Sequence, residues 1–142
     1  MDDKYVVKKT IEILAPAMKV WEALTQASLT KKYMFGYSVK SYWSAGSSIL
    51  WENNFEGKTV IRKGKVIEVE HGKFLKFTDY NPEIDPSEDE SRHALITYRL
   101  ESKNEYTVLK VTDDCSGDAK KFEDSNKFWN TVLPKLKELL EH

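Results

Sequence analysis

The sequence predicts an α+β domain in which one long C-terminal helix covers a face of an antiparallel sheet of about six strands. The middle of the chain alternates apolar and polar residues with a period of two, as strands do. The last part of the chain instead repeats apolar side chains on one face of a helix. With 142 residues the chain fits a single domain, residues 1–142, with one hydrophobic core.

A first strand and two short helices are expected before residue 37. Residues 5–13 place apolar side chains on one face with a period of two, which predicts the strand. Pro16 suits the first turn of a helix, and the apolar positions after it have helical spacing: Ala17, Val20, Trp21 and Leu24. A second short helix is expected to begin at Ser28 as its N-cap and to end near Gly36.

Five more strands are expected in the middle of the chain, at residues 47–53, 58–70, 74–80, 93–101 and 106–114. The last two are joined by a short segment that suits a hairpin. Gly64 lies inside the longest strand, where a glycine indicates either a β-bulge or a close approach of two backbones.

The closing helix is expected to span about two dozen residues. Its apolar stripe consists of Phe122, Ser125, Trp129, Val132, Leu133, Leu136 and Leu140. Ser116 or Asp118 can cap its first turn. Pro134 lies inside the helix and removes one backbone hydrogen bond, which predicts a kink.

The charge balance gives no reason to expect binding to nucleic acid or to a membrane surface. The 22 basic and 23 acidic residues leave a formal net charge of −1. The sequence shows neither a signal peptide nor a membrane-spanning stretch, and its single cysteine fits a reducing compartment. We therefore expect a cytoplasmic monomer. The final Leu-Glu-His resembles the remnant of a purification tag, so Glu141 and His142 are left out of the functional argument.

Three segments carry a recognisable pattern: "APAMKVWEALTQASLTKKYMFG" near the N-terminus, "GKVIEVEHGKFLKFTDY" in the middle and "FWNTVLPKLKELL" at the end. Together they resemble the START-like (SRPBCC) superfamily. The branch they resemble is named after the activator of the ninety-kilodalton heat-shock chaperone's ATPase. The resemblance runs from about residue 4 to residue 140.

This resemblance implies a helix-grip fold, in which the curved sheet grips the long C-terminal helix. In the superfamily the space between the two often holds an apolar ligand. The eukaryotic co-chaperone has a separate domain in front of this one, and this chain begins at the START-like domain, so the resemblance does not imply chaperone activation. The family motif designates no catalytic residue to carry over.

We expect a small apolar ligand, such as a lipid, a polyketide or a flavonoid-like molecule, between the sheet and the last helix. Rings of Trp and Tyr carry a polar group and fill a dry core poorly, although a filled core remains the alternative. Trp21, on the stripe of the first helix, is expected in the core. The residues expected at the mouth are Met34, Phe35 and Trp43, and those expected in the wall are Trp51, Phe77, Tyr98, Trp129 and Leu133.

Two other functions remain open. Exposed rings in residues 33–43 would suit a module that docks on a chaperone or another protein. A cyclase- or dehydratase-like enzyme would need polar groups inside the cavity, for which the candidates are Arg62, Glu68, His93 and Arg99. No catalytic motif, metal site or cofactor site is recognisable, and acids near Cys115 should raise its pKa. We therefore expect a protein that is not an enzyme.

Overall fold

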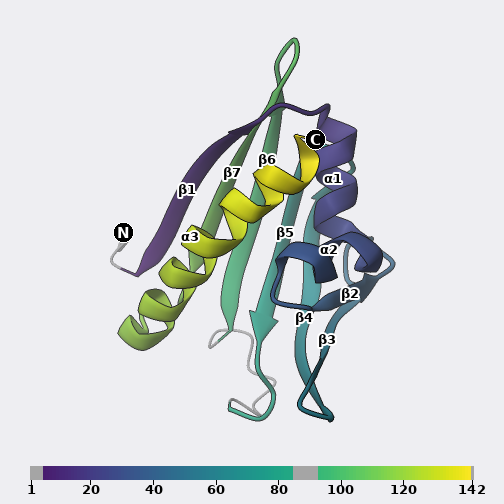
Figure 1. Ribbon diagram of the computed structural model, residues 1–142. Coiled ribbons are helices and arrows are strands. Elements are labelled where there is room, and N and C mark those ends of the chain that lie inside the picture. The colour runs from purple at the N-terminus through teal and green to yellow at the C-terminus, as the bar shows by residue number, and fades with distance from the viewer. Residues whose placement is uncertain (1–4, 85–92, 142) are drawn as a thin grey trace.

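The computed structural model describes residues 5–84 and 93–141, and shows in them a seven-stranded antiparallel sheet with three helices on one of its faces (Figure 1). The strands are β1 (Val6–Ile13), β2 (Ser38–Ser41), β3 (Ser48–Phe55), β4 (Lys58–Glu70), β5 (Phe74–Tyr80), β6 (Ala94–Ser102) and β7 (Thr107–Asp114). The helices are α1 (Ala17–Thr25), α2 (Ala27–Tyr33) and α3 (Ala119–Leu140). Across the sheet the strand order is β1-β7-β6-β5-β4-β3-β2. This is the helix-grip architecture.

The sheet has one strand more than the expected six. The additional strand, β2, lies at an edge and pairs with β3, so that Val39 is opposite Trp51. It has only four residues, too few for an alternating pattern to be recognised in the sequence. Strand β3 also continues through Asn53 to Phe55, beyond its expected end.

Gly64 lies where β4 and β5 approach closely. It is opposite Asp79 in the register of these strands, and a methyl group on its Cα would lie 1.9 Å from the carbonyl oxygen of Thr78. The register shift in β4 occurs further along, between Val66 and Glu68. Of the two explanations for this glycine, the close approach of backbones is therefore the one confirmed.

The first two helices follow each other almost without a connection. Helix α1 ends at Thr25, and Gln26 is both its C-cap and the N-cap of α2. The expected cap, Ser28, is thus already inside α2, because the helix begins earlier than the sequence suggested. The hydroxyl of Tyr33 donates to the carbonyl of Ala23 (2.6 Å) and fixes α2 against α1.

Asp118 is the residue that caps α3. Its Oδ1 accepts hydrogen bonds from the backbone amides of Lys120 (2.9 Å) and Lys121 (3.1 Å). The other candidate, Ser116, instead donates from its hydroxyl to the carbonyl of His93 (2.7 Å). At the other end, Glu141 accepts from Lys137 Nζ (2.6 Å) and from the amide of Leu14 (2.8 Å), whereas His142 lies outside the described residues.

Removing this cap should weaken the fold measurably. We expect Asp118→Ala to lower the free energy of unfolding by about 1 kcal/mol, because two amides of the first turn lose their acceptor. Asp118→Asn keeps an acceptor oxygen and should stay close to the wild type. Urea unfolding followed by circular dichroism measures both; equal stability of the alanine and asparagine variants would contradict the role of the cap.

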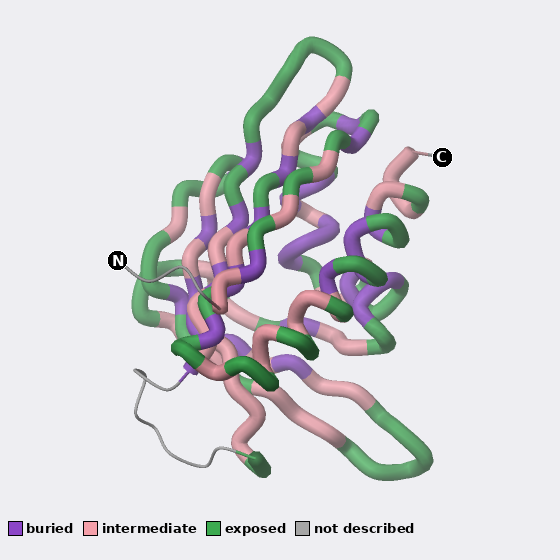
Figure 2. Tube along the Cα trace, turned by 90° about the vertical axis from the view of Figure 1, so that its left-hand side faces the viewer, coloured by how far each residue is buried: buried purple, intermediate pink, exposed green. Residues whose placement is uncertain are grey.

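The core lies between the inner face of the sheet and the helices (Figure 2). Trp21 is buried there, as expected, and its ring meets His71 edge-on at 5.7 Å. Helices α1 and α2 both contact α3, and the buried residues of α3 all lie from Trp129 onward. The space that remains between helix and sheet is therefore beside the N-terminal half of α3.

Candidate functional site

A cavity of about 630 Å³ lies between the inner face of the sheet and the N-terminal half of α3. The apolar residues that line it are Met34, Phe35, Tyr37, Trp51, Phe77, Tyr80, Ile84, Ala94, Ile96, Tyr98, Phe128 and Trp129. The polar residues that line it are Arg62, Asp79, Asn81, Asp113, Asp118, Lys120, Lys121, Asp124 and Ser125. The volume is in the range of sites for small molecules.

Strand alternation brings these side chains to one face. Within β5, Phe77 and Asp79 are two residues apart, as Ala94, Ile96 and Tyr98 are within β6, so each set shares one side of the sheet. Phe77 lies opposite Ile96, and Ile96 lies opposite Asp113 of β7. The lining therefore crosses the sheet from β3 to β7.

A chain of ring contacts closes one side of the cavity. Tyr98 meets Phe77 at 5.4 Å and Trp129 at 6.0 Å between ring centroids, both edge-on. Phe128 meets Trp129 at 5.0 Å and Phe35 at 5.7 Å. Phe35 is 51% exposed, so this chain runs from the buried interior to the surface and ends at an opening of the cavity.

Arg62 and Asp79 form an ion pair in the cavity wall. The guanidinium donates twice to the carboxylate, from Nη2 to Oδ2 (2.7 Å) and from Nε to Oδ1 (3.2 Å). The negative charge of Asp79 is the main reason why the pKa of Arg62 is raised. This two-point geometry fixes both side chains.

Asp113 is a buried carboxyl on the same face of the sheet. Its Oδ2 accepts a hydrogen bond from the indole Nε1 of Trp129 (3.0 Å). Burial raises the pKa of Asp113, and the negative charge of Asp79 adds to this, while the hydrogen bonds from Trp129 and Ser125 lower it in part. Burial likewise raises the pKa of Tyr98 well above its ordinary value.

Six of the eight predicted ligand-binding residues line this cavity: Met34, Phe35, Trp51, Phe77, Tyr98 and Trp129. Trp43 and Leu133 are placed elsewhere. Trp43 is half-buried at the turn after β2, where its Nε1 donates to the carbonyl of Thr25 at the end of α1 (3.1 Å). Leu133 is buried in the core one turn beyond Trp129, beside the part of α3 that α1 and α2 cover.

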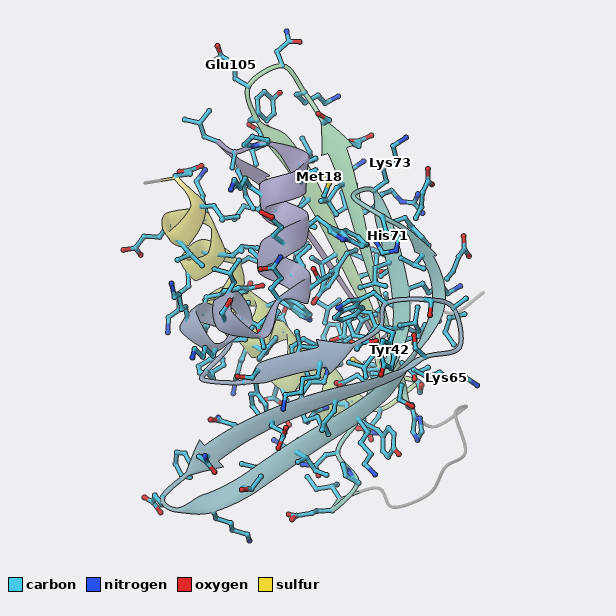
Figure 3. The ribbon with its side chains drawn as sticks, turned by 90° about the vertical axis from the view of Figure 1, so that its right-hand side faces the viewer. Met18, Tyr42, Lys65, His71, Lys73 and Glu105 are labelled. Atoms are coloured by element: carbon cyan, nitrogen blue, oxygen red, sulfur yellow. The ribbon has the colours of Figure 1, made fainter. Side chains whose placement is uncertain are left out.

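The ring-rich stretch at residues 33–43 thus separates into different environments. Tyr33 and Met34 are buried, and Phe35 lies at the cavity opening. Tyr42 is 93% exposed and lines a shallow surface depression. Figure 3 shows Tyr42 in the same region of the surface as Lys65 of β4, and the amide of Gly46 donates to the carbonyl of Val66 there (2.8 Å). The loop that carries Tyr42 and Trp43 is therefore not at the opening of the cavity, where it was expected.

Of the four polar residues proposed for a cavity enzyme, only Arg62 lines the cavity. Glu68 and Arg99 are exposed, and the guanidinium of Arg99 lies over the ring of Phe74 at 4.7 Å. His93 is buried and stacks on Tyr80 at 3.8 Å. The pKa of Cys115 is raised to about 12, mainly by burial and next by the charge of Asp113, so the direction agrees with the expectation although the nearby acids are not its main cause.

Asp79 and Asp113 were not among the residues expected in the site. Both continue an alternation whose other members are apolar: Leu75 and Phe77 precede Asp79, and Leu109 and Val111 precede Asp113. That pattern could have placed the two carboxyls on the inner face.

Among the residues that the structure describes, no group of three or more His, Cys, Asp or Glu side chains could hold a metal ion. In the same part of the chain no helix has the length and apolar character needed to cross a bilayer.

A family model described as "Activator of Hsp90 ATPase homolog 1-like protein" matches residues 14–141. No curated protein matches the chain. Among solved structures, the solution structure of ChR145 from Cytophaga hutchinsonii is 30% identical and has a TM-score of 0.80, with 99% of this chain and 97% of that chain covered.

Two more distant structures share the fold. The Aha1 dimer from Colwellia psychrerythraea is 22% identical with a TM-score of 0.74, and 96% of each chain is covered. DynU16, a protein in the dynemicin biosynthetic locus, is 21% identical with a TM-score of 0.75; the match covers 99% of this chain and 48% of that chain.

Proposed function

Because the chain belongs to the activator of Hsp90 ATPase homolog 1-like family, and because its fold holds an apolar cavity, we propose that it binds a small, largely apolar molecule between the sheet and α3. The observation that carries this proposal is the cavity of about 630 Å³, whose wall combines a chain of touching rings with polar side chains. Ligand sites typically combine these two features.

The proposed contact residues are the six rings and side chains that both the sequence and the cavity indicate: Met34, Phe35, Trp51, Phe77, Tyr98 and Trp129. Met34 is buried and flexible, which suits a wall that adapts to its ligand. The indole Nε1 of Trp51 is buried without a hydrogen-bond partner among the described residues, and such a donor is costly to leave unpaired.

An NMR titration of labelled protein with lipids, flavonoids and other planar apolar molecules tests the proposal. We expect saturable shifts that cluster on Trp51, Tyr98 and Trp129. Shifts from no compound, or shifts confined to the outer face of the sheet, would contradict a ligand site inside the cavity.

A variant that fills the cavity should block binding. Ala94 lines the cavity at the start of β6, so we expect Ala94→Phe to weaken the binding of any ligand found in the titration by about tenfold or more, because the phenyl ring takes the space. The matched control is Leu95→Phe, whose side chain points to the opposite face. Calorimetric titration of both variants measures the affinities, and equal affinities would show that the ligand lies elsewhere.

A cavity enzyme is the second candidate, and one observation favours it. Asp113 and Tyr98 both line the cavity and both have raised pKa values, a feature of acid–base sites. Mass spectrometry of ligands recovered after long incubation separates the two functions: unchanged molecules support binding alone, and converted molecules support catalysis.

Docking on a chaperone or another protein stays a prediction, as do the cytoplasmic location and the monomeric state. The ring-rich stretch exposes Phe35 and Tyr42. They lie in different surroundings, one at the cavity opening and one at the separate depression. This division favours a ligand cavity over a single docking patch.

A further inference from the structure

We propose that the ligand of this cavity is an apolar amine, whose protonated amino group is held by the carboxylate of Asp113. This inference rests on the proposed function and specifies the class of molecule that the site selects. It is carried by the charges that line the cavity and by the hydrogen-bond partners of Asp113, which differ from those of Asp79 and Asp124.

The cavity carries an excess of negative charge. In the described part of the chain, its basic and acidic lining residues are three cations and four carboxylates: Arg62, Lys120, Lys121, Asp79, Asp113, Asp118 and Asp124. Most of these charges are engaged near the rim or in the wall. Lys120 pairs with Asp124 (2.9 Å), and Arg62 pairs with Asp79 (2.7 Å). Asp118 accepts hydrogen bonds from two backbone amides in the first turn of α3.

Asp113 is different because its hydrogen-bond donors are neutral. The indole of Trp129 donates to Oδ2 at 3.0 Å, Ser125 also hydrogen-bonds to the carboxyl, and the thiol of Cys115 lies 3.8 Å from Oδ1. None of these groups offsets a full negative charge. A carboxylate has about four acceptor positions, so the carboxyl retains capacity for a further, charged donor.

The groups that face Asp113 favour a cation there. Asp79 on β5 and Tyr98 on β6 interact with it electrostatically, and Asp79 makes the site more negative. Arg62 on β4 acts the other way: its positive charge lowers the pKa of Asp113, although less than the hydrogen bonds from Trp129 and Ser125 do, and its guanidinium is hydrogen-bonded to Asp79. From α3, Trp129 and Ser125 contribute neutral donors. An ammonium group would supply the missing partner for a buried carboxylate.

The same arrangement disfavours a ligand with a carboxylate. Among the strand residues that line the cavity, Arg62 is the cation that could bind a carboxylate, and it already makes two hydrogen bonds to Asp79. An acid placed beside it would bring a further negative charge toward both Asp79 and Asp113, in surroundings where burial strengthens the repulsion. Selectivity between an amine and an acid is therefore the property that distinguishes this proposal.

Decylamine, 1-decanol and decanoic acid test this selectivity, because they share one apolar body and differ in the polar end. At pH 7 the amine is protonated and the acid is ionised. We expect decylamine to bind about tenfold or more tightly than 1-decanol, as a charged hydrogen bond would give, and decanoic acid to bind most weakly. The indole N–H resonance of Trp129, which reports on Asp113, should shift most with the amine.

The variant Asp113→Asn keeps the shape and an acceptor for Trp129 but removes the charge. We expect it to lose the preference for the amine while it still binds 1-decanol. The matched control is Asp114→Asn, which makes the same charge change at the next, exposed residue of the strand. This control should keep the preference. The ranking of the three probes in the wild type is a second measurement that needs no folded variant.

The outcomes separate this inference from the proposed function. If 1-decanol binds in the cavity but the amine has no advantage, or if the acid binds more tightly, the assignment to an amine is overturned and the apolar site stands. If the preference for the amine survives in Asp113→Asn, the role of Asp113 is overturned. If none of the three probes binds, the apolar ligand site itself is contradicted.

Discussion

Replacing Gly64 by alanine is expected to lower the free energy of unfolding by roughly 3 kcal/mol, the upper end of what overpacking a well-ordered site costs. The new methyl group would lie 1.9 Å from the carbonyl oxygen of Thr78. The obstructing atom belongs to the backbone of the paired strand, so no side-chain rotation relieves the contact. Strands β4 and β5 must move apart, and urea unfolding measures the loss.

Gly64→Ala should disturb the cavity wall as well as lower the free energy of unfolding. Gly64 lies opposite Asp79 and two residues from Arg62, so moving the strands apart separates the ion pair in the cavity wall. The control is Gly57→Ala, at a position with φ +78 and open space around it. There only the left-handed backbone is penalised, by about 1–2 kcal/mol. Equal stability of Gly64→Ala and the wild type would show that β4 and β5 leave room for a methyl group at position 64.

Much of the fold could be predicted because its elements carry long, regular patterns. The stripe of α3 and the alternation of β4 to β7 each extend over several repeats, and Gly64 indicated a bulge or a close approach, of which the structure shows the second. Strand β2 could not be found, since four residues give no pattern. The start of α2 was missed because no side chain caps it.

The candidate site could be predicted where a ring lies on a regular element. Trp51, Phe77 and Tyr98 alternate within strands, so their face follows from their position. Trp43 follows β2 in a turn with a φ of 56°. Outside a helix or strand, no periodic pattern predicts the direction of a side chain. Leu133 lies on the expected apolar stripe of α3. Whether this stripe contacts a cavity or another helix at that point depends on where α1 and α2 pack.

The carboxyls that line the cavity were not predicted from the sequence, and they matter more to the site than the misplaced Trp43 and Leu133. A carboxyl at an inward position of a strand contradicts the usual separation of apolar and charged residues, and such positions tend to be functional. Asp79 and Asp113 are two of them on one face. Their spacing along the chain does not indicate that β5 and β7 bring them to the same cavity.

Replacing Trp129 by alanine is expected to lower the free energy of unfolding by about 3 kcal/mol and to abolish binding of the ligand. The ring is 2% exposed and packs edge-on against Tyr98 and Phe128. One side of it faces the cavity, which keeps the loss at the lower end for a buried tryptophan. The alanine also leaves Asp113 without its indole donor. Wild-type stability together with lost binding would show that the ring serves the cavity alone.

Trp129→Phe keeps an aromatic ring at this position but removes the N–H that donates to Asp113. The dependence of its stability on pH tests whether this hydrogen bond acts on the ionised carboxyl. The pKa of Asp113 is raised in the folded protein, so stability falls as the pH rises from the ordinary aspartate pKa of about 3.9 through the folded value. The indole hydrogen bond limits this rise in pKa, so its removal should raise the pKa further. We therefore expect Trp129→Phe to be destabilising by about 1 kcal/mol or more at neutral pH and progressively less so in acid, where the carboxyl is protonated in both states. Urea unfolding across this range decides it, and a destabilisation that does not change with pH would mean that the hydrogen bond does not act on the ionised form of Asp113.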